Sequence, residues 1–407
     1  MLNSYLKPAA TLMLAGSLLF SGVAFGQDKK EEKEEKGYKF TEVKDIPVTS
    51  VKNQYRSGTC WSFSGLGLME AEIIRKGGEP TDLSEMFVVR NCYSDKAEKY
   101  VRLHGSLNLA AGGGFSDILY VMKNYGMVPE NAYEGLNYGE KKHTHGEMDV
   151  VLKDYADAVI KNKNRKLTPA WHKGFDGILD AYLGEYPSNF KVEGKEYTPE
   201  SYLKSLGLNA DDYIEISSFT HKPYYKPFIM ELPDNWMWAE TYNVPLDDMM
   251  EIIDNALENG YTVAWASDVS EKGFSWSNGV AVVPDAERED LAGTEKEKWE
   301  KLTSKEKRSA LYSFDKPVKE KKITPEMRQA AYDNWETTDD HGMLLTGISK
   351  DQEGNRFYKV KNSWGNENHK YDGYFYASKP FVAYKTTNIM IHKDAVPKSI
   401  RKKLGLK

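Results

Sequence analysis

The most regular hydrophobic pattern in this chain is helical. Apolar residues recur every three or four positions after Cys60 and stop at the glycine pair 77–78, which predicts a helix that begins close to Cys60. The same spacing predicts helices over residues 118–126, 150–160 and 174–183. The first half of the chain is therefore expected to be largely helical.

A second pattern appears further along, where apolar residues alternate with polar ones or form short continuous runs. Such segments favour strands, and they cover residues 261–266, 342–348, 356–361 and 373–376. We therefore expect an α+β fold with two lobes. A helical lobe begun by the Cys60 helix would face a sheet lobe, with the functional site at the seam between them.

The first residues have the pattern of an export signal. Lys7 supplies a short positive region, residues 9–25 are almost wholly apolar or small, and a charged run follows at 29–36. The apolar stretch is shorter than the ~20 residues that a membrane span needs, so an uncleaved anchor is the less favoured alternative. We expect a signal peptide at 1–26, a charged linker at 27–45, and export to the periplasm or medium without a stable membrane anchor.

The composition is that of an ordinary globular enzyme. The chain has 407 residues, of which 40% are hydrophobic, and this is enough to bury a large core. Its formal net charge is −6. Lysine and arginine are interspersed with acidic residues, so no nucleic-acid surface is indicated. With two cysteines there is no zinc-type spacing, and we expect no metal and no cofactor. His143 and His145 lie in a polar loop and are expected to be solvated.

Three widely separated residues carry the chemistry that this chain suggests. Cys60, His341 and Asn362 supply the thiol, the imidazole and the carboxamide that peptide-bond cleavage through a thioester needs. The positive end of the predicted helix favours the thiolate of Cys60, and an imidazolium at His341 would lower the thiol pKa further. His341 would then donate a proton to the leaving amine, and Asn362 would orient the imidazole.

Further residues would support this reaction. The amide of Gln54, six positions before the thiol, and the backbone N–H of Cys60 would donate to the oxyanion. Trp364 would shield the bond between the asparagine and the histidine from water. Gly113 and Gly114 have no side chains, so a substrate backbone can approach them closely.

Each of these features also has a structural interpretation. A cysteine at the start of an apolar helix is commonly a core residue, the histidine could be satisfied at a strand entrance, and the glycines could form a plain helix-entry loop. The combination favours catalysis, because five positions of the right type occur in the right order.

The run from Gln54 to Trp61, with His341 and the sequence from Asn362 to Gly365, resembles the papain-type cysteine peptidases. The resemblance implies that the glycine pair lines the substrate cleft and that peptides are the substrates. Members of the family commonly pair a cysteine three residues before the nucleophile with a second one. Here the first position is Ser57, so Cys92, which resembles the second, is expected to be free and buried.

The spacing of the cysteine and histidine indicates a particular branch. Simple papain-like enzymes place the histidine roughly 130–150 residues after the cysteine, whereas the gap here is 281. The excess lies in a predicted helical insertion at about 140–238 and a charged insertion at about 285–322, within a catalytic domain at 46–407. The layout resembles the bleomycin hydrolase and bacterial aminopeptidase C branch. That resemblance implies a thiol aminopeptidase, typically hexameric, with active sites facing an inner cavity.

One departure keeps the cleavage mode open. In that branch the C-terminal tail lies in the cleft, where its terminal carboxylate can pair with the free amine of the peptide, but residues 397–407 end short of the usual tail. An exported aminopeptidase is the leading hypothesis, and a broader cysteine endopeptidase is the alternative. A catalytically silent peptide-binding scaffold is less favoured, because a binder has no need of all four reactive positions.

Overall fold

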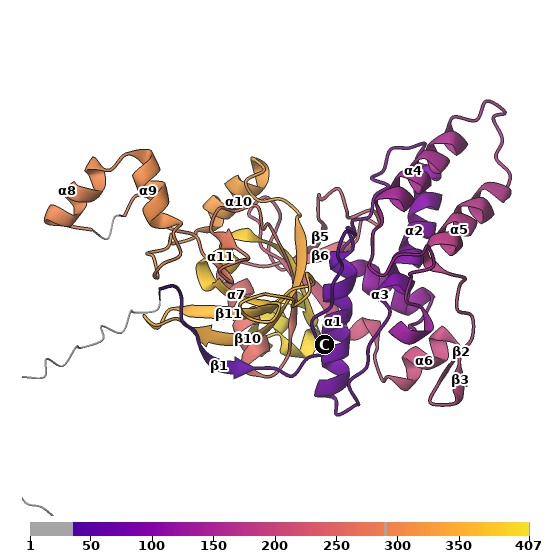
Figure 1. Ribbon diagram of the computed structural model, residues 1–407, viewed down its shortest axis with the longest axis horizontal. Helices are drawn as coiled ribbons and strands as arrows, with labels where there is room; N and C mark the ends of the chain where they lie inside the picture. The colour runs from indigo at the N-terminus through magenta and orange to yellow at the C-terminus, as the bar shows by residue number, and fades with distance from the viewer. Residues whose placement is uncertain (1–35, 289–290, 407) are drawn as a thin grey trace, which may run out of the picture. The chain divides into compact units, whose positions relative to one another are not determined.

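Eleven strands form one sheet in the computed structural model, which describes residues 36–288 and 291–406 (Figure 1). The sheet and helices described below belong to one compact unit that begins at Gly37. The predicted signal peptide and residues 27–35 of the predicted linker lie outside the described residues, whereas residues 41–45 of that linker form β1. Within the described ranges, no helix has the length and apolar character needed to cross a membrane.

The sheet follows the order β5-β6-β4-β13-β7-β10-β11-β12-β9-β8, and β1 pairs with β10 outside this path. Its strands have these bounds: β1 (Thr41–Asp45), β4 (Tyr213–Ser217), β5 (Lys226–Ile229), β6 (Glu240–Asn243), β7 (Val263–Ser267), β8 (Phe274–Ser275), β9 (Val280–Ala281), β10 (His341–Lys350), β11 (Arg356–Lys361), β12 (Tyr374–Ser378) and β13 (Thr386–His392). The four strands predicted from the sequence are β7, β10, β11 and β12, and all four are confirmed.

Helices are the main regular elements in the first half of the described chain. They are α1 (Cys60–Arg75), α2 (Glu85–Arg102), α3 (Phe115–Asn124), α4 (Gly146–Ile160), α5 (Ala170–Leu183) and α6 (Pro199–Ser205). Later helices are α7 (Leu246–Glu258), α8 (Gly293–Lys301), α9 (Ser304–Leu311), α10 (Pro325–Asp333), α11 (Lys379–Lys385) and α12 (Lys398–Leu404). The predicted helices correspond to α1, α3, α4 and α5, with boundaries shifted by a few residues.

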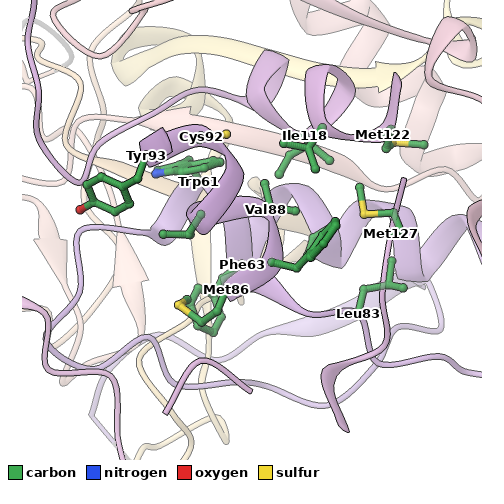
Figure 2. Close-up of a cluster of buried hydrophobic side chains, with 14 of the residues drawn as sticks. Trp61, Phe63, Leu83, Met86, Val88, Cys92, Tyr93, Ile118, Met122 and Met127 are labelled. Carbon is green, nitrogen blue, oxygen red and sulfur yellow. The ribbon is translucent and has the colours of Figure 1, made fainter. Parts of the chain in front are cut away.

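The helix α1 lies between the sheet and the other helices of the first half (Figure 1). It packs on β10 and β7 on one side and on α2 and α3 on the other, so every residue from Trp61 to Ile73 is buried. This two-sided burial explains why the sequence of α1 is apolar or small almost throughout. Figure 2 shows Trp61 and Phe63 of this helix among buried side chains of α2 and α3.

Two cores meet along β10. Leu344 packs in the core of the helical lobe, whereas its neighbours Met343 and Leu345 pack in the core of the sheet lobe. Because successive side chains of a strand point to opposite faces, β10 joins both cores. The strand therefore has a fixed position against α1, and its first residue, His341, is held close to the start of that helix.

The segment at 140–238 was expected to be helical throughout, and this expectation was wrong for its last part. The helices α4, α5 and α6 are followed by β4 and β5, which belong to the main sheet. A small hairpin, β2 (Phe190–Val192) and β3 (Lys195–Tyr197), precedes α6. The strand β4 pairs with β13, so tertiary pairing decided the conformation of this short segment.

Candidate active site

The candidate nucleophile, Cys60, is the first residue of α1 and is half-buried. It lines a cavity of about 390 Å³, whose other walls include the glycine loop 112–114, the start of β10 and the ring of Trp364. The start of β10 crosses the start of α1 closely. A side chain at Gly342 would lie 3.2 Å from the backbone nitrogen of Trp61. Glycine at this position therefore permits His341 to approach the cysteine.

A hydrogen-bond chain fixes the orientation of the His341 ring. Its Nε2 lies 2.7 Å from Oδ1 of Asn362, and the backbone N–H of Ser363 donates to the same Oδ1 at 2.8 Å. A backbone N–H can only donate, so this atom of Asn362 is the acceptor oxygen. Nε2 of His341 must then carry the proton, which leaves Nδ1 free to accept one.

The ring of Trp364 covers this pair. It stacks on His341 with ring centroids 4.7 Å apart and an interplanar angle of 25°. Trp276 and Phe274 pack edge-on against Trp364, and their centroids lie 5.2 Å and 6.0 Å away. The aromatic cluster excludes water from one face of the imidazole, which strengthens the hydrogen bond between His341 and Asn362.

Burial acts on the charges of both reacting groups. It raises the pKa of the Cys60 thiol to about 11, against the opposing effect of the Gly342 backbone amide. Burial also lowers the pKa of His341 to about 4, although the bond to Asn362 acts in the opposite direction. The sequence had predicted a lowered thiol pKa, and this effect of burial runs against that prediction. Burial therefore disfavours a thiolate at Cys60 alone and an imidazolium at His341 alone. The two ions are best formed together, by transfer of the thiol proton to the imidazole, because each then stabilises the other.

The carboxamide of Gln54 is held from both ends. Its Nε2 donates to the carbonyl oxygen of Ser57 at 2.8 Å, and its Oε1 accepts from the hydroxyl of Ser363 at 2.6 Å. Since a carbonyl can only accept, the nitrogen must face Ser57. Its second N–H is left over and Gln54 lines the cavity, so it is available as an oxyanion donor.

A buried charge network anchors the segment that carries Gln54. Lys52 pairs with Glu70 of α1 at 2.9 Å and with Glu85 of α2 at 2.6 Å. Its backbone oxygen accepts the N–H of Gly365, immediately after Trp364. The segment before the cysteine is thereby connected both to the helical lobe and to the strand end that carries Asn362.

The glycine loop opposite His341 is fixed by two donors. Nζ of Lys96 donates to the backbone oxygen of Gly112 at 2.5 Å, and the indole of Trp61 donates to Ala111 at 3.0 Å. A side chain at Gly113 would lie 2.8 Å from the Trp61 ring. Glycine is therefore required at Gly113 by packing, and Gly113 and Gly114 both line the cavity.

The structure brings all of the predicted site residues to this one cavity or its immediate wall. Asn362 does not line the cavity but forms a hydrogen bond with His341, which does. The other predicted residues line the cavity directly. Cys92 lies elsewhere, 1% exposed within the core of the helical lobe, and is free as predicted. The expected exposure of His143 and His145 was wrong. Both are buried, because the loop is pulled inward by backbone hydrogen bonds between Arg56 and the two histidines.

Sequence reasoning missed the acidic side chains that line the same cavity. They come from separate segments: Glu215, Asp234, Asp339 and Asp340. The only available signal was the position of the two aspartates immediately before His341. Ser363, which holds Gln54, was also missed as a contact, although it lies next to Asn362.

Two family models match this chain on either side of its middle. Residues 38–175 match the papain family of cysteine proteases, and residues 309–406 match the Peptidase C1-like family. The first match contains the cysteine, and the second contains the histidine and asparagine. The chain belongs to the papain-like cysteine peptidases.

Curated relatives of this peptidase include enzymes named aminopeptidase C. That of Lactobacillus delbrueckii subsp. lactis is 25% identical across 88% of this chain and 82% of the relative. That of Streptococcus thermophilus is 22% identical across 86% and 82%. The crystal structure of PepW from Lactobacillus rhamnosis HN001 superimposes with a TM-score of 0.66 at 19% identity, covering 90% of this chain and 84% of the other. The peptidase therefore has the papain-like α+β fold that the sequence predicted.

Proposed function

We propose that this peptidase is an exported cysteine aminopeptidase that removes residues from the free N-terminus of peptides through a thioester at Cys60. The observation that carries the proposal is the fixed arrangement of Cys60, His341, Asn362 and Gln54 around one cavity. The names and the coverage of the aminopeptidase C relatives support the N-terminal mode of cleavage.

The chemistry follows from the protonation pattern of the site. The thiol proton of Cys60 moves to Nδ1 of His341 as the sulfur attacks the peptide carbonyl carbon. The oxyanion that develops accepts hydrogen bonds from the backbone N–H of Cys60 and from Nε2 of Gln54. As the carbon–nitrogen bond breaks, the imidazolium gives its proton to the leaving amine. A water molecule, deprotonated by His341, then hydrolyses the thioester and regenerates the thiol.

A specific observation also supports a second candidate, an endopeptidase. Residues 398–404 form α12, and its side chains Ile400 and Leu404 pack in the core of the sheet lobe. Asn388 is the last residue in the described part of the chain that lines the cavity. The cavity is therefore not narrowed by the tail residues that the structure describes, and a longer peptide could cross it.

One comparison distinguishes the two modes. A peptide of about ten residues is digested in two forms, with a free and with an acetylated N-terminus, and the products are mapped over time by mass spectrometry. Stepwise loss of single N-terminal residues from the free form alone supports the aminopeptidase. Equal cleavage of both forms at internal bonds would establish the endopeptidase instead. Cys60→Ala serves as the control for contaminating peptidases.

Export is tested separately. The proposal rests on the signal-peptide pattern at residues 1–26. Expression in a bacterial host with a Sec pathway should give a periplasmic or secreted product whose mature N-terminus is Gln27. A full-length product that stays in the cytoplasm, with Met1 retained, would contradict it.

A further inference from the structure

The active-site cavity is rich in acidic side chains. Four carboxylates line it: Glu215 of β4, Asp234 in the loop between β5 and β6, and Asp339 and Asp340 before β10. No lysine or arginine within the described ranges lines this cavity, so His341 is its only basic side chain. Binding of an uncharged peptide backbone does not require four carboxylate side chains in one cavity.

Two of the four carboxylates have structural partners. Asp340 accepts hydrogen bonds from the backbone N–H groups of Val269 and Ser270 at 3.3 and 3.2 Å, and from the hydroxyl of Thr338 at 2.6 Å. Asp234 accepts from the side-chain amide of Asn108 at 2.8 Å. Asp340 and Asp234 therefore have a structural role, because their hydrogen bonds hold neighbouring loops together.

Glu215 is only partly satisfied. It is 8% exposed, and its Oε2 accepts a hydrogen bond from Asn388 at 2.5 Å. Its Oε1 is buried and has no hydrogen-bond partner among residues 36–288 and 291–406. Burial raises the pKa of this carboxyl to about 7, although Asn388 and the nearby Ser116 oppose the rise.

Asp339 has fewer partners still. Asp339 is half-buried, and in the part of the chain that the structure describes its carboxylate has no hydrogen-bond or ion-pair partner. Burial and the neighbouring Asp234, Asp340 and Glu215 raise its pKa to about 7. Asp339 also acts on the Cys60 thiol, whose pKa it raises, so the two side chains lie within electrostatic reach of one another.

A buried carboxylate oxygen without a partner, such as Oε1 of Glu215, destabilises a fold, and packing alone does not explain it. A cation that enters this part of the cavity would pair with the free oxygen of Glu215 and with the half-buried carboxylate of Asp339, and it would favour the ionised forms of both groups. In a peptide cut after its first residue, the α-nitrogen lies about 2.5 Å from the carbonyl carbon under attack, as standard backbone dimensions require. The α-ammonium of such a substrate must therefore lie close to Cys60, on the wall that Asp339 helps to form.

We propose that Asp339 and Glu215 receive a cationic nitrogen of the bound peptide, which in an aminopeptidase substrate is its α-ammonium. The inference rests on the proposed function and adds a receptor for the free N-terminus within the described chain. The same charge could also hold a lysine or arginine side chain of the residue preceding the cleaved bond. Contacts of this kind are charge-assisted and are roughly twice as strong as neutral hydrogen bonds.

The test uses four fluorogenic amides of aminomethylcoumarin: leucyl, acetyl-leucyl, acetyl-lysyl-leucyl and acetyl-norleucyl-leucyl. The rates of the leucyl and acetyl-leucyl amides differ by the effect of a free α-ammonium. The rates of the acetyl-lysyl-leucyl and acetyl-norleucyl-leucyl amides differ by the effect of a basic side chain, since norleucine is an uncharged residue of similar length. Values of kcat/KM are measured for the wild type, Asp339→Asn and Glu215→Gln. Asp247→Asn, an exposed aspartate at the start of α7, is the matched control. Titration of Cys60 with an epoxide reagent corrects each rate for the fraction of folded sites.

The expected result is a loss of about 10-fold or more in kcat/KM for the leucyl amide in Asp339→Asn and Glu215→Gln, with acetyl-leucyl amide changed by less than about 2-fold. The control should leave both rates unchanged. If the variants instead lose preference for acetyl-lysyl-leucyl over acetyl-norleucyl-leucyl, the receptor holds a basic side chain.

The inference is overturned if correctly folded variants keep both preferences at the wild-type level. That outcome is distinct from failure of the proposed function, in which the wild type itself would not discriminate between the leucyl and acetyl-leucyl amides. If the wild type and both variants all preferred the free amine to the same degree, the aminopeptidase activity would be supported. Asp339 and Glu215 would then have no part in recognising the α-ammonium.

Discussion

Oδ1 of Asn362 lies 2.7 Å from Nε2 of His341, and this contact determines which nitrogen of the ring faces the thiol. The backbone N–H of Ser363 donates to the same oxygen, so the carboxamide cannot be reversed without losing a hydrogen bond. The imidazole is thereby held with its proton on Nε2, and Nδ1 can accept the proton of Cys60.

Removal of this contact should weaken catalysis without abolishing it. Asn362→Ala is expected to lower kcat/KM by about 10-fold, a smaller loss than that of an oxyanion donor, because the stacked Trp364 still restricts the His341 ring. Steady-state kinetics measures the loss, and Asn366→Ala, an exposed neighbour, is the control. A rate equal to that of the wild type would mean that Trp364 alone positions the histidine.

The carboxamide of Gln54 is expected to act on the transition state. Gln54→Ala should lower kcat by roughly 10²-fold, the scale observed when one oxyanion donor is removed, with KM little changed. The exposed Gln352→Ala provides the comparison, and it should keep the full rate. If kcat survived in the Gln54 variant, the oxyanion would have to be stabilised by other donors.

The two cysteines should differ sharply in reactivity. Cys92 is 1% exposed and burial raises its pKa well above its usual range, whereas Cys60 opens to the cavity. Cys60→Ser is expected to remove turnover while circular dichroism stays unchanged, and a haloketone reagent should label only Cys60 in the wild type. Labelling of Cys92, with activity retained in Cys60→Ser, would refute the assignment of the nucleophile.

The buried pair His143 and His145 should make the fold sensitive to acid. Burial lowers the pKa of His143 to about 4, and burial together with the charge of His143 lowers the pKa of His145 to about 4. Above pH 6.5 neither the folded nor the unfolded chain protonates them, so their contribution to stability is complete. As the pH falls from 6.5 towards 4, only the unfolded chain binds protons, and the free energy of unfolding decreases.

His145→Leu should reduce this dependence. Both ring nitrogens of His145 are buried without partners among the described residues, so an apolar replacement should be neutral or stabilising at pH 7. Between pH 6 and pH 4.5 the slope of unfolding free energy against pH should fall by up to about 1.4 kcal/mol per pH unit. Urea denaturation at several pH values measures it, with the exposed His104→Asn as the control. An unchanged slope would show that His145 titrates normally in the folded chain.

Much of this architecture could be predicted because the sequence pattern and the tertiary packing agree. The helix after Cys60 and the strand after His341 are apolar enough to be identified locally, and their first residues are the reacting groups. The segments β4 and β5 are short and carry no strong period, so their conformation was decided by pairing, of β4 with the distant β13 and of β5 with the following strand β6.

The acidic wall of the cavity could not be found in the same way. Glu215, Asp234 and Asp339 belong to three separate segments, and each has the local sequence of an ordinary surface residue. Only the folded sheet brings them together. The burial of His143 and His145 was equally hidden, because it depends on backbone hydrogen bonds to Arg56 rather than on an apolar pattern.

Cys60 is expected to form a covalent thioester with the substrate acyl group, and rapid-quench mass spectrometry tests for this intermediate directly. The enzyme is mixed with the p-nitrophenyl ester of leucine, quenched in acid within its first turnover and analysed as intact protein and as peptides. The expected result is one leucyl group per chain, on the peptide that contains Cys60, and its release by hydroxylamine. A leucyl group on Cys92, or hydrolysis of peptide amides by Cys60→Ala at the wild-type rate, would contradict it.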